Sequence, residues 1–203
     1  MRLQVITDSL SIVDATLSVG APAIQIRAKQ LSDRSAYQLV LAAAARCRRA
    51  GAVCVVDDRV HVAAAAGAAL GFPVGAHVGA TDLPVAAARA VLGPDAVLGG
   101  TARDPVAAQA VAAAGASYVG VGPTYHTTTK TGLPAPLGPD RVGAVAASVA
   151  IPVIAIGGIT VERIPELLAA GITGVAVVGA VSHAADPAAA TRALLAALEV
   201  PVP

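Results

Sequence analysis

The sequence predicts a single α/β domain over residues 1–203, folded as a closed (β/α)₈ barrel, or TIM barrel. Three observations lead to this prediction. Short apolar β-type segments alternate with alanine-rich helical segments, the chain is long enough for eight such pairs, and no change of composition marks a boundary. In addition, the last two β-type segments lead directly into glycine. Glycine lets a ligand approach backbone N–H groups, and barrels of this kind often hold a phosphate there.

The expected elements can be assigned in order along the chain. Strands are expected at 3–7, 23–27, 53–57, 74–77, 96–99, 117–121, 153–156 and 174–178, and helices at 33–50, 84–92, 105–114, 161–170 and 186–198. Ser32 and Asp104 stand where N-cap residues belong. Gly51 and Gly171 stand where glycines end helices. Strands that alternate with helices of this length indicate a parallel sheet.

Net charge, hydropathy and cysteine spacing limit the classes of partner and the cellular location that we expect. The formal net charge is +1, which provides no general attraction to nucleic acid or to an anionic membrane. The longest apolar stretch is interrupted by His61, Pro73 and His77, so no membrane span is expected. Cys47 and Cys54 lack metal-ligand or redox-motif spacing and are expected to be reduced core residues. Because the N-terminus enters a strand without a signal peptide, we expect a cytoplasmic protein.

Charged residues follow the second strand on one face. Strand side chains alternate between faces, so Gln25, Arg27 and Lys29 should all point into the mouth of the barrel. Two cations and an amide suit a diphosphate ligand. The alternative is a polar plug that fills the interior of the barrel.

Carboxylates follow the third and fourth strands. Asp57 and Asp58 end the third strand, and Asp82 precedes the next helix. Carboxylates at strand ends suit Mg²⁺, which also accepts water and phosphate oxygens. The alternative is that these aspartates cap the helices that follow. His77, a lone histidine in the fourth strand, is more typical of a structural hydrogen-bonding residue.

The segment 122–132 is the longest polar loop of the chain. It holds five threonines, including Thr127 and Thr129, together with Lys130. This composition is typical of a lid that closes over an anion. An ordinary solvated loop is the alternative.

Taken together, these motifs resemble those of the thiamine phosphate synthase family and its relatives, the thiazole tautomerases. The resemblance runs from Leu3 to about Val181 and is closer to the synthases. It rests on five motifs in order: Gln25-Ile-Arg-Ala-Lys29, Asp57-Asp58-Arg59, His77 to Pro84, Gly122 to Lys130, and Ala155-Ile-Gly-Gly-Ile159.

The resemblance implies a transferase that joins hydroxymethylpyrimidine diphosphate to thiazole phosphate and releases pyrophosphate. It implies that Mg²⁺ binds Asp58 and Asp82, and that Arg27, Lys29 and Lys130 hold the leaving pyrophosphate. The backbone around Gly157, Gly158, Val178 and Gly179 would hold the thiazole phosphate. The remaining contacts to the small-molecule substrates would come from Gln25, Asp57, Thr101, Thr127 and Thr129.

The sequence also departs from the family pattern. Asp57 replaces an asparagine, Ala80 a glutamine and Thr128 a proline, and Arg103 stands where the relatives have a histidine. Two alternatives therefore stay open: an isomerase of the tautomerase type, or a diverged relative that acts on or binds another phosphorylated heterocycle. Arginine stays protonated and is a poor base, which argues against the isomerase. The oligomeric state is left open, with a homo-oligomer among the expectations.

Overall fold

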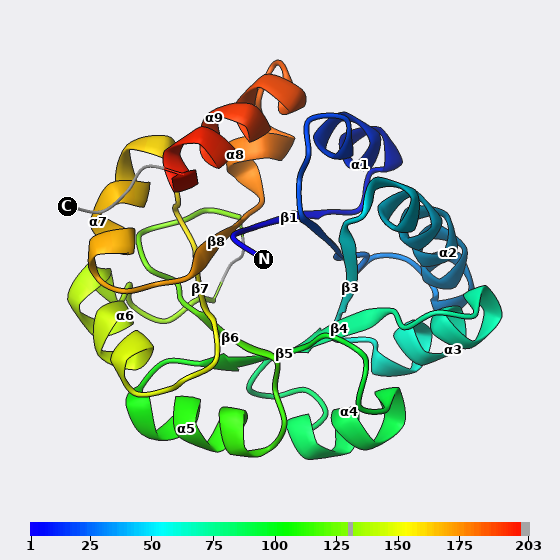
Figure 1. Cartoon of the computed structure of the whole chain (residues 1–203), viewed down its shortest axis with the longest axis horizontal. Helices are drawn as coiled ribbons and strands as arrows, with labels where there is room; N and C mark the ends of the chain where they lie inside the picture. The colour runs from blue at the N-terminus through cyan, green and yellow to red at the C-terminus, as the bar shows by residue number, and fades with distance from the viewer. Residues whose placement is uncertain (130–131, 200–203) are drawn as a thin grey trace.

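The computed structural model describes residues 1–129 and 132–199, and in it eight parallel strands close into a barrel in the order β1 to β8. Figure 1 looks along this barrel and shows the helices arranged around the ring of strands. The strands are β1 (Leu3–Thr7), β2 (Ala23–Ile26), β3 (Val53–Asp57), β4 (Gly75–Val78), β5 (Leu98–Ala102), β6 (Tyr118–Val121), β7 (Val153–Ile156) and β8 (Gly174–Val177). The predicted (β/α)₈ fold is confirmed.

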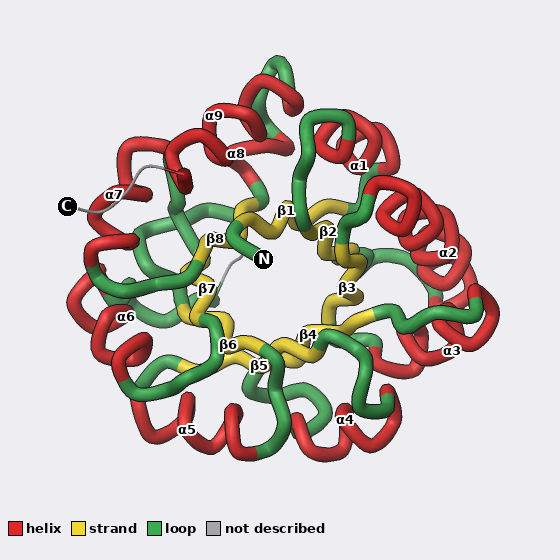
Figure 2. The backbone as a smooth tube through the Cα atoms, in the orientation of Figure 1, coloured by secondary structure: helices red, strands yellow, loops and turns green. Residues whose placement is uncertain are grey.

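Helices follow the strands and form the outer layer, as the tube in Figure 2 shows. They are α1 (Leu10–Leu17), α2 (Asp33–Ala50), α3 (Val60–Leu70), α4 (Val85–Leu92), α5 (Pro105–Ala113), α6 (Gly138–Ala147), η1 (Val161–Arg163), α7 (Ile164–Ala169), α8 (Gly179–Ser182) and α9 (Pro187–Glu199). The expected helix 161–170 is divided between the 3₁₀ turn η1 and α7.

The predicted helix ends are confirmed. The Ser32 hydroxyl accepts a hydrogen bond from the backbone N–H of Ser35 at 3.2 Å, and the Asp104 carboxylate accepts one from Ala107 at 2.9 Å. Each side chain satisfies one of the N–H groups that a helix leaves unpaired at its start. Gly51 ends α2 with a φ of 70°, the left-handed conformation that favours glycine.

The alternation of side chains along each strand produces two apolar layers. In β1, Leu3 and Val5 are fully buried against the helices, whereas Ile6 packs inside the barrel with Tyr118 and Ile154. Successive strand residues point to opposite faces, so a short strand contributes to both layers. The outer layer is mainly apolar, and the inner layer combines apolar residues such as Ile6 with the buried polar residues Gln4 and Gln25.

The expected position of β5 is wrong by several residues. The strand was expected at 96–99, but it runs from Leu98 to Ala102. The pair Gly99-Gly100 suggests the end of a strand, yet both glycines lie inside it and pair with Tyr118 and Val119 of β6. Smaller shifts occur elsewhere, for example in β4, which extends one residue past His77 to Val78.

Two further expectations can be compared with the described residues. Cys47 and Cys54 are both buried and carry free thiols, as predicted. Within residues 1–129 and 132–199, the helices are too short or too polar to span a membrane.

Candidate active site

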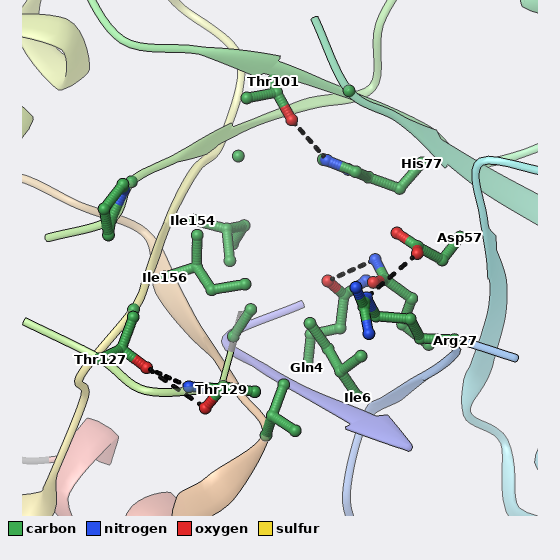
Figure 3. A pocket seen from close by; sticks show the side chains of 18 of the residues that line it. Gln4, Ile6, Arg27, Asp57, His77, Thr101, Thr127, Thr129, Ile154 and Ile156 are labelled. Atoms are coloured by element: carbon green, nitrogen blue, oxygen red, sulfur yellow. Dashed lines mark hydrogen bonds and ion pairs between the residues drawn. The ribbon is translucent and has the colours of Figure 1, made fainter. Parts of the chain in front are cut away.

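A cavity of about 560 Å³ opens at the carboxyl ends of the strands. Its volume lies within the range of small-molecule binding sites. Figure 3 shows how side chains from several strands and from the loop after β6 surround it. The structure brings the following sequence-predicted residues together on its wall: Gln25, Arg27, Lys29, Asp57, Asp58, Asp82, Thr101, Thr127, Thr129, Gly157, Gly158, Val178 and Gly179. Lys130 lies outside the described residues.

One side of the cavity carries opposite charges: Arg27 and Lys29, which follow β2, and Asp57 at the end of β3, which we call the charged cluster. The Asp57 carboxylate lies 3.4 Å from both Arg27 Nε and Lys29 Nζ, and Lys29 also contacts the Asp58 carboxylate. Asp57 and Arg27 face one another in Figure 3. Asp57 Oδ2 is buried and has no hydrogen-bond partner among the described residues. The cluster therefore holds two cations at the mouth, with one carboxylate oxygen still lacking a hydrogen bond.

The backbone turns sharply at Asp58. Its φ of 60° lies in the left-handed region, which aspartate tolerates better than most residues. The Asp58 N–H donates to the carbonyl of His77 at 2.8 Å, which ties the turn to β4. The next helix, α3, begins after Arg59 and has no side-chain cap. The alternative that Asp57 or Asp58 caps this helix is therefore wrong.

Asp82 lies in the loop after β4, the strand that pairs with β3. Its carboxylate accepts a hydrogen bond from the backbone N–H of Gly79 at 2.8 Å. The helix α4 begins after Pro84 without a side-chain cap, so capping of α4 is not the role of Asp82. Among the described residues no cluster of three His, Cys, Asp or Glu side chains is placed to hold a metal ion.

The floor of the cavity is a chain of hydrogen bonds inside the barrel. Gln25 donates to Gln4 at 3.3 Å, and Gln4 donates to the Tyr118 hydroxyl at 3.2 Å. His77 continues the chain, with Nδ1 3.0 Å from the Tyr118 hydroxyl and Nε2 2.9 Å from the Thr101 hydroxyl. Figure 3 shows His77 and Thr101 facing one another. Gln25 thus belongs both to a polar plug and to the cavity wall, and His77 is a hydrogen-bonding residue, as expected.

Sequence reasoning missed Gln4 and Tyr118. Gln4 is 2% exposed and is flanked by apolar residues in β1. A buried polar residue in an apolar strand needs a partner, so it indicates a polar interior. That signal was available in the sequence. The hydrogen bond between Gln4 and Tyr118 could not be predicted, because 114 positions separate the two residues in the sequence.

The His77 environment predicts a pH dependence of stability. Burial lowers the pKa of His77, and the nearby Asp57 and Asp82 carboxylates oppose this only in part. His77 therefore takes up a proton more readily in the unfolded chain than in the folded chain. As a result, the free energy of unfolding decreases as the pH falls below about 6.5. We expect urea denaturation to give a smaller loss of unfolding free energy between pH 7.5 and pH 5.5 for His77→Gln than for the unchanged chain. Equal losses would contradict this prediction.

Glycines after β7 form a tight turn at the opposite side of the cavity. Gly157 and Gly158 have φ values of 95° and 66°. A Cβ on Gly157 would lie 2.8 Å from Pro123, and one on Gly158 would lie 2.8 Å from the Tyr125 Cβ. Only glycine fits because the loop after β6 packs directly on this turn. We call residues 157–159 the glycine turn.

The loop after β6 reaches over the cavity from the glycine turn. The Thr127 hydroxyl donates to that of Thr129 at 3.2 Å, and both residues line the cavity (Figure 3). Arg103 of the β5–α5 connection donates to the carbonyls of Gly122 at 3.2 Å and Ala135 at 2.8 Å. Arg103 thereby fastens both ends of this loop.

Comparison with known proteins identifies the family of this chain. The family model described as thiamine monophosphate synthase matches residues 3–181. The thiamine-phosphate synthases of Salinispora tropica and Salinispora arenicola are 55% and 52% identical to this chain, and each alignment covers 97% of both chains. The solved thiamine phosphate pyrophosphorylase from Pyrococcus furiosus superposes with a TM-score of 0.87 at 32% identity, covering 98% of this chain and 95% of that one. On these matches, the chain belongs to the thiamine monophosphate synthase family.

Proposed function

We propose that this transferase of thiamine biosynthesis joins hydroxymethylpyrimidine diphosphate to thiazole phosphate in a Mg²⁺-dependent reaction that yields thiamine phosphate and pyrophosphate. The observation that carries the proposal is that one cavity is lined by the charged cluster, by the Asp58 and Asp82 carboxylates and by the glycine turn. Two phosphorylated substrates need two anion sites, and the cavity has two sides suited to them.

The proposed reaction is a substitution at a methylene carbon. The C–O bond between this carbon and the diphosphate breaks, and pyrophosphate leaves with the electron pair. The aminopyrimidine ring donates electron density to the methylene carbon, and the thiazole nitrogen then supplies the lone pair that forms the new C–N bond. The protein needs no nucleophile, because stabilising the leaving group and aligning the two substrates lower the barrier.

The charged cluster would receive the diphosphate. Arg27 and Lys29 side chains are 33% and 40% exposed, so both can reach a ligand in the cavity. Their contacts with Asp57 hold them in place before a ligand arrives, and a fixed charge loses less free energy to reorganisation. Lys130, which lies outside the described residues, is proposed as a third cation on the basis of the family motif alone.

The residues present suit Mg²⁺. Asp58 and Asp82 both line the cavity, and Asp58 is 22% exposed. Mg²⁺ commonly binds through one or two carboxylates together with substrate phosphates and water. We propose that Asp58 and Asp82 are these carboxylates. When bound, the metal would neutralise charge on the diphosphate and so improve the leaving group.

The glycine turn and the start of α8 would hold the thiazole phosphate. Val178 and Gly179 follow β8 beside the glycine turn, and all of these residues line the cavity. Thr129 lies close to Gly179, since a Cβ built on that glycine would be 3.7 Å from the Thr129 hydroxyl. Thr127 and Thr129 would contact the substrates from the loop, and Gln25 and Thr101 from the floor.

A two-substrate assay tests the proposed function. Pyrophosphate is followed with both substrates and MgCl₂, with each substrate omitted in turn, and with EDTA in excess. We expect release only when both substrates and the metal are present, and restoration when Mg²⁺ is added back. Conversion of the thiazole without pyrophosphate would instead indicate an isomerase, and binding without conversion would indicate a ligand-binding relative.

A further inference from the structure

Arg163, at the end of η1, contacts the back of the glycine turn. Its guanidinium Nη1 donates to the carbonyl of Gly158. The guanidinium carbon also lies 4.2 Å from the centre of the Tyr125 ring, which is close enough for a cation–π interaction. Arg163 is half-buried between the two groups. None of the proposed steps uses this residue.

Tyr125 connects the same contact to the loop after β6. Its hydroxyl donates to the Glu166 carboxylate of α7, and its backbone N–H donates to the carbonyl of Gly157 at 3.0 Å. Burial and the Glu166 carboxylate both raise the pKa of Tyr125, so its hydroxyl keeps its proton. Two residues of η1 and α7 thus hold the Tyr125 side chain, and Tyr125 in turn holds the glycine turn.

These contacts fix the direction of the backbone amides in the turn. In a trans peptide the C=O of one residue and the N–H of the next point in opposite directions. The carbonyl of Gly157 is bound by Tyr125, and that of Gly158 by Arg163. The N–H groups of Gly158 and Ile159 must therefore point away from these partners.

Both of these N–H groups are available for a ligand. Gly158 and Ile159 line the cavity, and neither N–H has a hydrogen-bond partner within the part of the chain that the structure describes. Buried backbone donors are nearly always paired in folded proteins. Two unpaired donors from successive residues, facing one cavity, suit the oxygens of a phosphate group.

We propose that Arg163 is a positioning residue that holds the Gly158 and Ile159 amides toward the phosphate monoester of one substrate, and that Tyr125 couples this turn to the loop bearing Thr127 and Thr129. The proposal rests on the proposed function, because it assigns the thiazole phosphate to the glycine turn. Arg163 itself does not touch the ligand. It acts through the carbonyl that it binds.

Steady-state kinetics of Arg163→Met provide the first test. Methionine preserves much of the apolar stem but removes the donor and the charge. A charge-assisted hydrogen bond that orients a binding group predicts a rise of at least ~10-fold in KM for the thiazole phosphate. The KM for the pyrimidine diphosphate should change less than about twofold, since the charged cluster is untouched. Arg192→Met, an exposed arginine of α9, is the matched control and should leave both KM values unchanged.

The conservative variant separates positioning from simple charge. Lysine keeps the positive charge but lacks the planar guanidinium that can stack on Tyr125 while donating to Gly158. We expect Arg163→Lys to retain a raised KM for the thiazole phosphate. Full recovery to the unchanged value would mean that only net charge matters and would overturn the proposal. Tyr125→Phe keeps the ring and loses the Glu166 bond, so it should raise this KM above that of the unchanged chain but less than Arg163→Met does. If Arg163→Met does not fold, an unchanged KM in Tyr125→Phe and in Arg163→Lys would overturn the proposal.

Amide NMR with inorganic phosphate separates this proposal from the proposed function. In the unchanged protein, phosphate should shift the Gly158 and Ile159 amide resonances, and Arg163→Met should weaken the apparent affinity at least ~10-fold. If these shifts occur but no thiamine phosphate forms, the positioning role stands and the proposed function fails. If the protein is active but Arg163→Met leaves both the phosphate titration and the KM values unchanged, the positioning role fails and the function stands.

Discussion

Replacing Asp58 with asparagine is expected to lower the turnover number at least ~10²-fold, a loss typical of removing one stabilising group from a developing charge. Asparagine has almost the shape of aspartate and also tolerates the left-handed conformation that Asp58 adopts, so the backbone turn is preserved. The substitution removes only the negative charge that would bind a cation beside the diphosphate. The initial rate of pyrophosphate release, measured over a range of MgCl₂ concentrations, should show both a lower maximum and a higher Mg²⁺ requirement.

Two controls separate the charge of Asp58 from its conformation. Asp58→Gly suits the positive φ better than aspartate does but also lacks the carboxylate, so it should be as inactive as Asp58→Asn. Asp33→Asn removes a surface carboxylate that lies 3.2 Å from Arg59, outside the cavity, and should leave turnover close to normal. Because the Lys29–Asp58 pair is partly exposed, its loss should change the thermal midpoint little. A turnover near normal in Asp58→Asn would contradict the proposed metal site.

The fold could be predicted from the sequence because its signal is local and repeated. Each strand is a short apolar run and each helix an alanine-rich segment, so an error in one element does not affect the others. The error at β5 has a physical cause. Gly99 and Gly100 suggest a strand end, since glycine is unfavourable in strands. Here they are needed because side chains from β6 and from the outer helices fill the space beside them.

The position of the candidate site could be predicted because parallel strands all end at one rim. Polar residues that follow a strand tend to lie there, and this places Arg27, Asp58 and Asp82 on the same cavity without further information. The contacts that orient these residues could not be predicted in this way. The contact between Tyr125 and Glu166 joins residues 41 positions apart, and no local sequence pattern indicates that the two are in contact.

Replacing Gly99 with alanine is expected to lower the free energy of unfolding by about 3 kcal/mol, at the upper end of the usual cost of overpacking a core. A methyl group at this position would overlap the Tyr118 ring and the His77 imidazole. Neither side chain can move without breaking hydrogen bonds, because Tyr118 is held by Gln4 and His77 by Thr101. The cost therefore includes both steric overlap and the loss of partners for buried polar groups.

The size of this effect can be separated from the general cost of replacing a glycine. Gly51→Ala is the control, because Gly51 has a φ of 70° and open space around a built Cβ. Only the backbone conformation disfavours alanine there, so we expect the free energy of unfolding to fall by about 1 kcal/mol. Urea denaturation followed by circular dichroism measures both variants. If Gly99→Ala costs no more than Gly51→Ala, then the floor is not closely packed, and the hydrogen-bonded chain from Gln25 to Thr101 cannot be what fixes the bottom of the cavity. If the difference is near 2 kcal/mol, the glycine is present because Tyr118 and His77 require its space.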